Sequence, residues 1–393
     1  MNERLTGKVT AANERSEAVT ERPRASGEFI AVRRSQPPPP RPSMLRATYQ
    51  SRAVSDLFRL CAAIGHEGSF DAYHYVLRTL FGGWGEREVV ENAPYPVGLG
   101  DDHSPFAFGL AFAPGGIDLR LLVEAQAKDA SPPSVRAAAL GLNRELASRF
   151  ELDFTRFSAL RDLLLDGNEG PLFTTWHAAR WRSGRLPAFR LYLKPRTHGI
   201  ARAEALVREA LGRLGFGAVA EPYLSRMTLR PGDTLRLLSF DVSSDADARV
   251  TVYAEHHGAT ADELEPIAAM SEHHVEGEIA RFATAMVGHA GPFLWKPVTT
   301  SISFVAGSPA PAAVAVHMPI SHYVDTDAVT VQRVSRFLRG HDLDDLSYRR
   351  AVHVFAPRSL ESDVGVQTFA SYRRDAEGPR LVAWLSPEIF RTA

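Results

Sequence analysis

Cationic and aromatic side chains recur at two-residue spacing in three short apolar stretches of the sequence. The stretches are LRLLVEA, with Arg120, Leu122 and Glu124; FRLYLKP, with Arg190, Tyr192 and Lys194; and ARVTVYA, with Arg249, Thr251 and Tyr253. Residues i and i+2 of a β-strand share a face, so each set lies on one side of its strand. Guanidinium groups bind phosphate bidentately, and tyrosine rings attract cations to their π-faces. This combination suits a reaction in which a diphosphate leaves and a carbocation remains.

A metal-bound diphosphate would need a carboxylate cluster such as DDxxD, and the sequence has none. Asp101-Asp102 is followed by His103-Ser104-Pro105, and the run from His341 to Asp345 has spacing more typical of a helix cap. The nucleotide, hydrolase and metalloprotease motifs GxxxxGKS/T, GxGxxG, GxSxG and HExxH are also absent. We therefore expect arginines, with no metal ion and no cofactor, to hold the diphosphate.

The elements that must position these residues are pairs of short apolar strands, separated by segments with helical spacing. Strand pairs begin near residues 106, 173, 235, 299 and 365, with turns expected at Pro114-Gly115-Gly116 and near Ser183-Gly184. Helices are expected over 54–61, 70–81, 133–150, 155–165, 201–215, 260–288, 327–339 and 344–357. The internal period of roughly sixty to seventy residues predicts a repeating unit of helices followed by a hairpin.

Five such hairpins predict an α+β fold with a ten-stranded antiparallel barrel, because closure removes every exposed sheet edge. If helices cover the outside of the barrel, the polar faces of the strands can contact water only in the lumen. Two packed α+β domains remain the alternative fold. Outward, solvated faces remain the alternative for the paired arginines and tyrosines.

The composition is that of a globular protein rather than a nucleic-acid or membrane binder. The 393 residues are 45% hydrophobic, and 45 basic against 46 acidic side chains give a net charge of −1. Cys61 is the only cysteine, and neither a membrane-spanning run nor a secretory signal appears. We expect a cytoplasmic protein, with a Pro-rich disordered tail over 1–43 and one barrel domain over 44–393. The oligomeric state is not predicted.

The sequence resembles the indole prenyltransferases of the dimethylallyltryptophan synthase family, and more closely their bacterial members. The resemblance covers roughly residues 50–390, through DDHSPFAFGLAF, LRLLVEA, FRLYLKPRTHG, LLSFDVSSDADARVTVYA, VHMPISHYVDTD and GVQTFASYR. It implies a barrel of five ααββ units, the PT barrel. It also implies metal-independent transfer of a prenyl group, in secondary metabolism, from an allylic diphosphate to an indole ring.

By resemblance, the residues that bind the diphosphate are Arg120, Arg190, Tyr192, Lys194, Arg249, Tyr253 and His317. Tyr192 and Tyr253 would also shield the carbocation, together with Phe369 and Gln367, which we expect to face inward. Thr251 replaces a common cation, His317 a tyrosine and Ala315 a glutamine, which suggests a thinner shield and room for a longer donor such as geranyl diphosphate.

The acceptor end departs further from the family pattern. Arg236 matches a residue that holds an amino-acid carboxylate, whereas Ala107 replaces the acid that usually accepts the indole N–H. The proton acceptor maps onto His177, with Glu124 as the other candidate. The expected substrates are dimethylallyl diphosphate and L-tryptophan or a tryptophan-derived metabolite. The alternative acceptors are an indolactam, a cyclic dipeptide and a phenolic compound. The alternative to an enzyme is a barrel that only binds a small ligand.

Overall fold

The computed structural model describes residues 47–94, 96–129, 131–165, 175–183, 185–195, 199–356 and 358–390. The predicted tail over 1–43, residues 44–46, the start of the second hairpin at Phe173 and the predicted turn at Gly184 lie outside the described residues. The domain boundary at residue 44 therefore stays a prediction.

Helices and strands alternate two by two along the described chain. The helices are α1 (Tyr49–Ile64), α2 (Phe70–Phe81), α3 (Pro132–Arg149), α4 (Thr155–Leu164), α5 (Ile200–Arg213), α6 (Gly217–Met227), α7 (Ala261–Ala268), α8 (Glu278–Val287), α9 (Asp327–Gly340) and α10 (Asp345–Phe355). The strands are β1 (Phe106–Ala113), β2 (Gly116–Glu124), β3 (Thr175–Trp181), β4 (Ala188–Leu193), β5 (Asp233–Asp241), β6 (Arg249–His256), β7 (Val298–Val305), β8 (Ala313–Met318), β9 (Gln367–Asp375) and β10 (Gly378–Leu385). This order confirms the predicted series of ααββ units.

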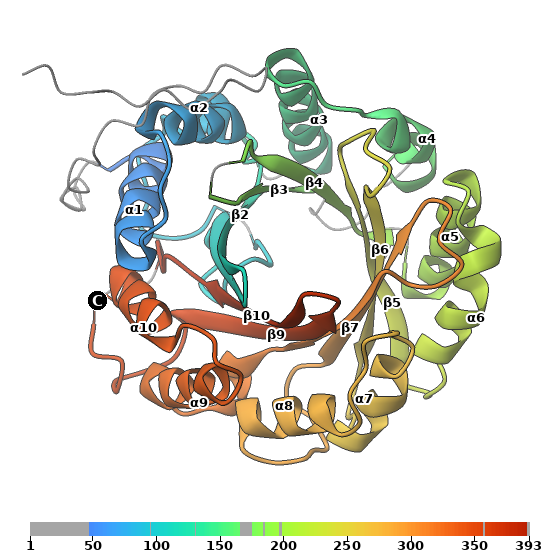
Figure 1. Ribbon diagram of the computed structural model, residues 1–393. Coiled ribbons are helices and arrows are strands. Elements are labelled where there is room, and N and C mark those ends of the chain that lie inside the picture. The colour runs from blue at the N-terminus through green and yellow to red at the C-terminus, as the bar shows by residue number, and fades with distance from the viewer. Residues whose placement is uncertain are drawn as a thin grey trace, which may run out of the picture. The chain divides into compact units, whose positions relative to one another are not determined.

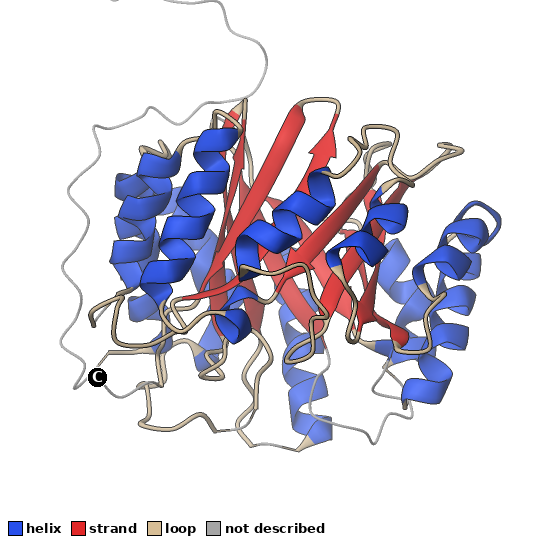
Figure 2. Ribbon diagram, turned by 90° about the horizontal axis from the view of Figure 1, so that it is seen from below, coloured by secondary structure: helices blue, strands red, loops and turns tan. Residues whose placement is uncertain are grey.

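The ten strands form one closed antiparallel barrel, in which each strand pairs with its neighbours in sequence and β1 pairs with β10. Phe108 lies opposite Leu385 in the closing pair. Figure 1 looks down the barrel and shows the helices in a ring around it, and Figure 2 shows the same helices outside the strands from the side. The predicted barrel is confirmed, and the two-domain alternative is wrong.

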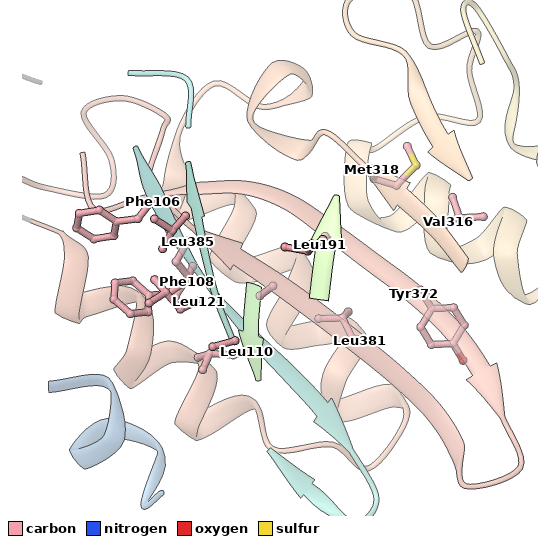
Figure 3. Close-up of a cluster of buried hydrophobic side chains, with 14 of the residues drawn as sticks. Phe106, Phe108, Leu110, Leu121, Leu191, Val316, Met318, Tyr372, Leu381 and Leu385 are labelled. Atoms are coloured by element: carbon pink, nitrogen blue, oxygen red, sulfur yellow. The ribbon is translucent and has the colours of Figure 1, made fainter. Parts of the chain in front are cut away.

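The strands close this way because their side chains alternate between two different surroundings. Phe106, Phe108 and Leu110 lie on one side of β1, as Figure 3 shows, and all three are fully buried. Phe108 stacks on Phe355 of α10, so this side faces the helices. The apolar face of each strand therefore forms the core with the helix layer, and the intervening residues face the lumen.

Two β-bulges interrupt this alternation and change which residues face inward. The pairing of β5 with β6 skips Arg236, and the pairing of β9 with β10 skips Thr368. A bulge places one extra residue in its strand, so the i, i+2 rule fails across it. Residues on the two sides of each bulge cannot be assigned to the lumen by counting.

The helix predictions differ from the structure at two places. Helix α6 was not predicted, because Pro222 lies inside it and Gly217 begins it, and both residues usually mark the end of a helix. The helices expected over 260–288 are α7 and α8, and the break between them was not located in advance. Helix α7 ends at Ala268, and α8 begins after Gly277, which has φ +72°.

Among the described residues, no helix has the length and apolar content needed to cross a membrane.

Candidate active site

A cavity of about 180 Å³ lies inside the barrel, lined by side chains from all ten strands. The predicted site residues that line it are Arg120, Arg190, Tyr192, Tyr253, His317, Phe369, Arg236 and Ala107. They come from β1, β2, β4, β5, β6, β8 and β9, which are far apart in sequence. The barrel thus brings together the charged and aromatic groups that the spacing predicts for a lumen.

Arg190 is held in the cavity wall by a partly buried ion pair with Asp241 on the neighbouring strand. Its Nε and Nη2 lie 2.8 and 2.7 Å from Asp241 Oδ1, and Nη1 donates to Thr251 Oγ1 at 3.3 Å. Burial alone would raise the pKa of Asp241, but the charge and hydrogen bond of Arg190 outweigh it and lower this pKa. Arg190 therefore stays charged and is fixed in direction.

Arg120 differs from Arg190 because the described residues give it no ion-pair partner. Its Nε is buried without a hydrogen bond, and its side chain lines the cavity. Burial and, next, the nearby charge of Arg180 lower the pKa of Arg120 to about 10. A partly buried guanidinium without an ion-pair partner is costly unless an anion binds it, which makes Arg120 the strongest anion-binding candidate among the described residues.

Sequence reasoning missed two further arginines in the cavity wall. Arg373 on β9 and Arg380 on β10 lie opposite each other in register, and both line the cavity. Asp375 lies 2.9 Å from Arg373 Nη2, and Asp118 lies 3.2 Å from Arg380 Nη1. Burial and, next, the charge of Arg249 lower the pKa of Arg373 to about 9. The two-residue alternation in β9 and β10 carries the same signal as in β2 and could have identified both.

Aromatic rings form a continuous arc along the same wall. The centroids of Trp176 and Tyr192 are 6.3 Å apart, those of Tyr192 and Tyr253 are 6.0 Å apart, and those of Tyr253 and His317 are 5.7 Å apart. Tyrosine and tryptophan faces stabilise a nearby cation. The arc therefore suits a carbocation that forms beside the arginines.

A second aromatic surface is formed by Phe369 and Trp384, which are paired across β9 and β10. The six-membered part of the Trp384 indole lies over Gly109, where an added Cβ would come within 3.0 Å of Trp384 Cζ3. Glycine at 109 thus lets a large ring lie against β1. Neither tryptophan of the cavity, Trp176 nor Trp384, was predicted.

His317 is fixed by hydrogen bonds at both ring nitrogens. Ser301 Oγ lies 2.9 Å from Nε2, and Ser371 Oγ lies 2.7 Å from Nδ1. Both serines also line the cavity. The imidazole therefore lies between two hydroxyl groups on the cavity wall.

No protein-family model matches the chain. Several solved structures do. One is the 6-dimethylallyltryptophan synthase from Micromonospora olivasterospora in complex with DMASPP and Trp, with 30% identity and a TM-score of 0.82 over 88% of this chain and 99% of that one. The chain belongs to the dimethylallyltryptophan synthase family of aromatic prenyltransferases. The resemblance seen in the sequence is thereby confirmed.

Two other members of the family are similar over nearly their whole length. The 5-dimethylallyltryptophan synthase from Streptomyces coelicolor has 27% identity and a TM-score of 0.81, over 88% of this chain and 97% of that one. The prenyltransferase PriB, in a ternary complex with L-tryptophan and dimethylallyl thiolodiphosphate, has 28% identity and a TM-score of 0.80, over 88% and 98%.

The structure of this prenyltransferase contradicts two of the predicted positions, His177 and Gln367. His177 does not face the cavity: Trp176 beside it lines the lumen, while His177 points to α3, where its Nε2 lies 2.7 Å from Asn143 Oδ1. Burial lowers the pKa of His177 to about 3. His177 follows Trp176 directly in β3, so its side chain lies on the face of the strand opposite to the lumen.

Gln367 also faces outward rather than into the lumen. Its amide oxygen accepts a hydrogen bond from the hydroxyl of Tyr348 on α10. The bulge at Thr368 is the reason, because it puts Gln367 and Phe369 on opposite faces although they are two residues apart.

Glu124, Lys194 and Arg249 lie near the cavity but are not among the residues that line it. Glu124 is buried behind Trp176, and burial raises its pKa to about 7, against the effects of the Trp176 hydrogen bond and of Lys194. Arg249 lies close enough to lower the pKa of Arg373. These three residues contribute to the field of the site rather than to its wall.

Arg236 lines the cavity but is already paired. Its Nη1 lies 2.9 Å from Glu255 Oε1, and the bulge in β5 is centred on it. Ala107 faces Leu122 across β1 and β2, so the wall there is apolar. Among the described residues, no group of three His, Cys, Asp or Glu side chains could hold a metal ion.

Proposed function

We propose that the protein transfers the dimethylallyl group of dimethylallyl diphosphate to the indole ring of L-tryptophan or of a tryptophan-derived metabolite, without a metal ion. The related structures with bound DMASPP and Trp support this substrate pair. The observation that carries the proposal is the unpaired guanidinium of Arg120, which lines the same cavity as the ring arc from Trp176 to Tyr253.

In this reaction the diphosphate binds to Arg120, Arg190, Arg373 and Arg380, with Arg249 adding to the positive potential. The C–O bond of the donor breaks, and its electron pair leaves with the diphosphate. Preorganised positive charge stabilises that leaving group, and the low dielectric of the cavity strengthens the attraction. The chain supplies this charge from arginines, which is why the proposed reaction needs no metal.

The allylic cation is held by the faces of Tyr192, Tyr253 and Trp176 until the indole attacks. The closed ring of strands surrounds the lumen and limits access of water, which would otherwise trap the cation. The acceptor lies toward Ala107 and Leu122, with Arg236 on its carboxylate. Arg236 then shares its charge between the substrate and Glu255.

The absence of a carboxylate among the described cavity-lining residues favours a second acceptor class. An indole N–H at Ala107 would meet no acidic partner there. A phenol has no indole N–H and loses less by this than tryptophan does, whereas an indole within a cyclic dipeptide carries the same N–H. These acceptors, and geranyl diphosphate as donor, are the alternatives to be tested alongside.

Incubation of the full-length protein with dimethylallyl diphosphate and each acceptor in EDTA, followed by mass spectrometry, tests the proposal. A product heavier than L-tryptophan by one C5H8 unit supports it, and product formation only after addition of Mg²⁺ contradicts metal independence. Products only with phenol or a cyclic dipeptide would assign the second acceptor class. If no product forms but calorimetry detects ligand binding, the protein would be assigned as a ligand-binding protein rather than an enzyme.

A further inference from the structure

Aromatic substitution needs a proton acceptor, because the ring carbon that gains the prenyl group must lose its hydrogen. The titratable side chains that line the cavity within the described residues are arginines, tyrosines and His317. Arginine remains protonated and the tyrosine hydroxyl is a proton donor near neutral pH. Imidazole is the only side-chain type in this set that commonly acts as a general base, which makes His317 the candidate proton acceptor among these residues.

The position of His317 allows it to receive a proton from within the cavity. Its two ring nitrogens lie 2.9 and 2.7 Å from the hydroxyl oxygens of Ser301 on β7 and Ser371 on β9. A neutral imidazole donates at one nitrogen and accepts at the other. One serine hydroxyl therefore donates to the unprotonated nitrogen of His317, and both hydroxyls are part of the cavity wall.

We propose that His317 is the base of the prenyl transfer and receives the ring proton through the hydroxyl of Ser301 or Ser371. The C–H bond of the alkylated ring breaks, and its electron pair restores the aromatic ring. The proton goes to the serine oxygen while the serine hydroxyl proton moves to His317. The positive charge thus passes from the ring to the imidazole, and the serine is unchanged. This inference rests on the proposed function.

The charges around His317 couple its basicity to the bound donor. Burial, followed by Arg120 on β2, Arg373 on β9 and Arg236 on β5, lowers the pKa of His317 to about 3. The ring of Tyr253 on β6 packs against the imidazole, with 5.7 Å between the centroids. A bound diphosphate offsets the positive charge of the arginines, which raises the basicity of the imidazole. His317 is therefore a stronger base with the diphosphate bound than in the empty cavity.

His317→Gln tests the inference, because glutamine can still bond to both serines but cannot take the proton. We expect kcat to fall by about 10²- to 10⁴-fold, the range for loss of a general base, while the KM for dimethylallyl diphosphate changes little. Ring-deuterated L-tryptophan gives the decisive readout. Proton loss becomes rate-limiting in the variant, so a primary isotope effect appears that is absent or smaller in the wild type.

Ser301→Ala and Ser371→Ala keep the imidazole and test the proton relay. They also keep the inference testable if circular dichroism shows that His317→Gln does not fold. The variant that lacks the proton-carrying serine should show the isotope effect, and the variant that lacks the other serine should not. The inference is overturned if His317→Gln keeps kcat within about threefold with no isotope effect, or if neither serine variant shows one. A wild type without any prenylated product overturns the proposed function itself.

Discussion

Trp176 donates its indole N–H to a buried carboxyl group, with 2.6 Å between its Nε1 and Oε2 of Glu124 on the adjacent strand. The same tryptophan lines the cavity, so a charged or neutral Glu124 changes the electron density of a ring that we propose to face the carbocation. Glu124 thus acts on the site through Trp176 rather than by contact with substrate.

Stability should depend on pH through Glu124. Because burial raises its pKa to about 7, the folded state binds this proton more tightly than the unfolded chain does. Its contribution is complete below the ordinary pKa of glutamate and is lost as the pH rises toward 7, by up to about 3 kcal/mol. Urea unfolding of Glu124→Gln across this range should show a smaller decline than the wild type. The exposed Glu67→Gln is the control, and equal declines in all three proteins would contradict the assignment.

Arg120→Gln should separate activity from stability. Loss of one preorganised donor to the leaving group lowers kcat by about 10²- to 10³-fold. Because Arg120 has no ion-pair partner among the described residues and lies near Arg180, its removal should leave Tm unchanged or higher. Steady-state kinetics and calorimetry check both, with the exposed Arg202→Gln as the control. A variant with a lower Tm and a normal kcat would show that Arg120 does not bind the diphosphate.

Arg236→Gln should weaken only those acceptors that carry a carboxylate. A hydrogen bond to a charged group contributes about 1.5–3 kcal/mol, so the KM for L-tryptophan should rise by about one to two orders of magnitude. The KM for tryptamine, which has no carboxylate, should stay near the wild-type value. An equal rise in KM for both acceptors would show that Arg236 stabilises the cavity wall through its ion pair with Glu255 and does not bind the substrate carboxylate.

Gly109→Ala should move Trp384. The new Cβ would lie 3.0 Å from the indole ring, closer than ordinary contact, so the ring must shift into the cavity or the strand must yield. We expect about 1–3 kcal/mol of lost stability or a raised KM for the acceptor. Gly115→Ala is the matched control, because an added Cβ there meets nothing within 4 Å. Crystallography of the variant would show whether Trp384 keeps its position; an unmoved ring with wild-type kinetics contradicts the prediction.

The barrel could be predicted from the sequence because it depends on patterns that repeat. Alternation in LRLLVEA and FRLYLKP places Arg120 and Arg190 in one lumen, and the same rule applied to β9 would have found Arg373. The rule needs an unbroken strand and a known start, however. It failed for Gln367, where a bulge shifts the register, whereas His177 was placed by resemblance without applying the alternation to β3.

The partners of the charged groups could not be predicted at all. Asp241 holds Arg190, and Asp118 holds Arg380 from a position 262 residues away in the chain. The first pair joins adjacent strands and the second reaches across β1, so both depend on the order of strands around the closed barrel, which no local pattern encodes. The unpaired state of Arg120, on which the proposed function depends, is visible only once those pairings are known.

The closed hydrogen-bonded ring of strands also limits how this protein can change over time. Inserting or deleting one residue within a strand would exchange its lumen-facing and helix-facing side chains, exposing apolar groups to the cavity and burying arginines against the helices. New specificities are therefore reached most easily by exchanging one side chain for another at fixed positions. Thr251, Ala107 and His317 are such positions, because all three line the cavity.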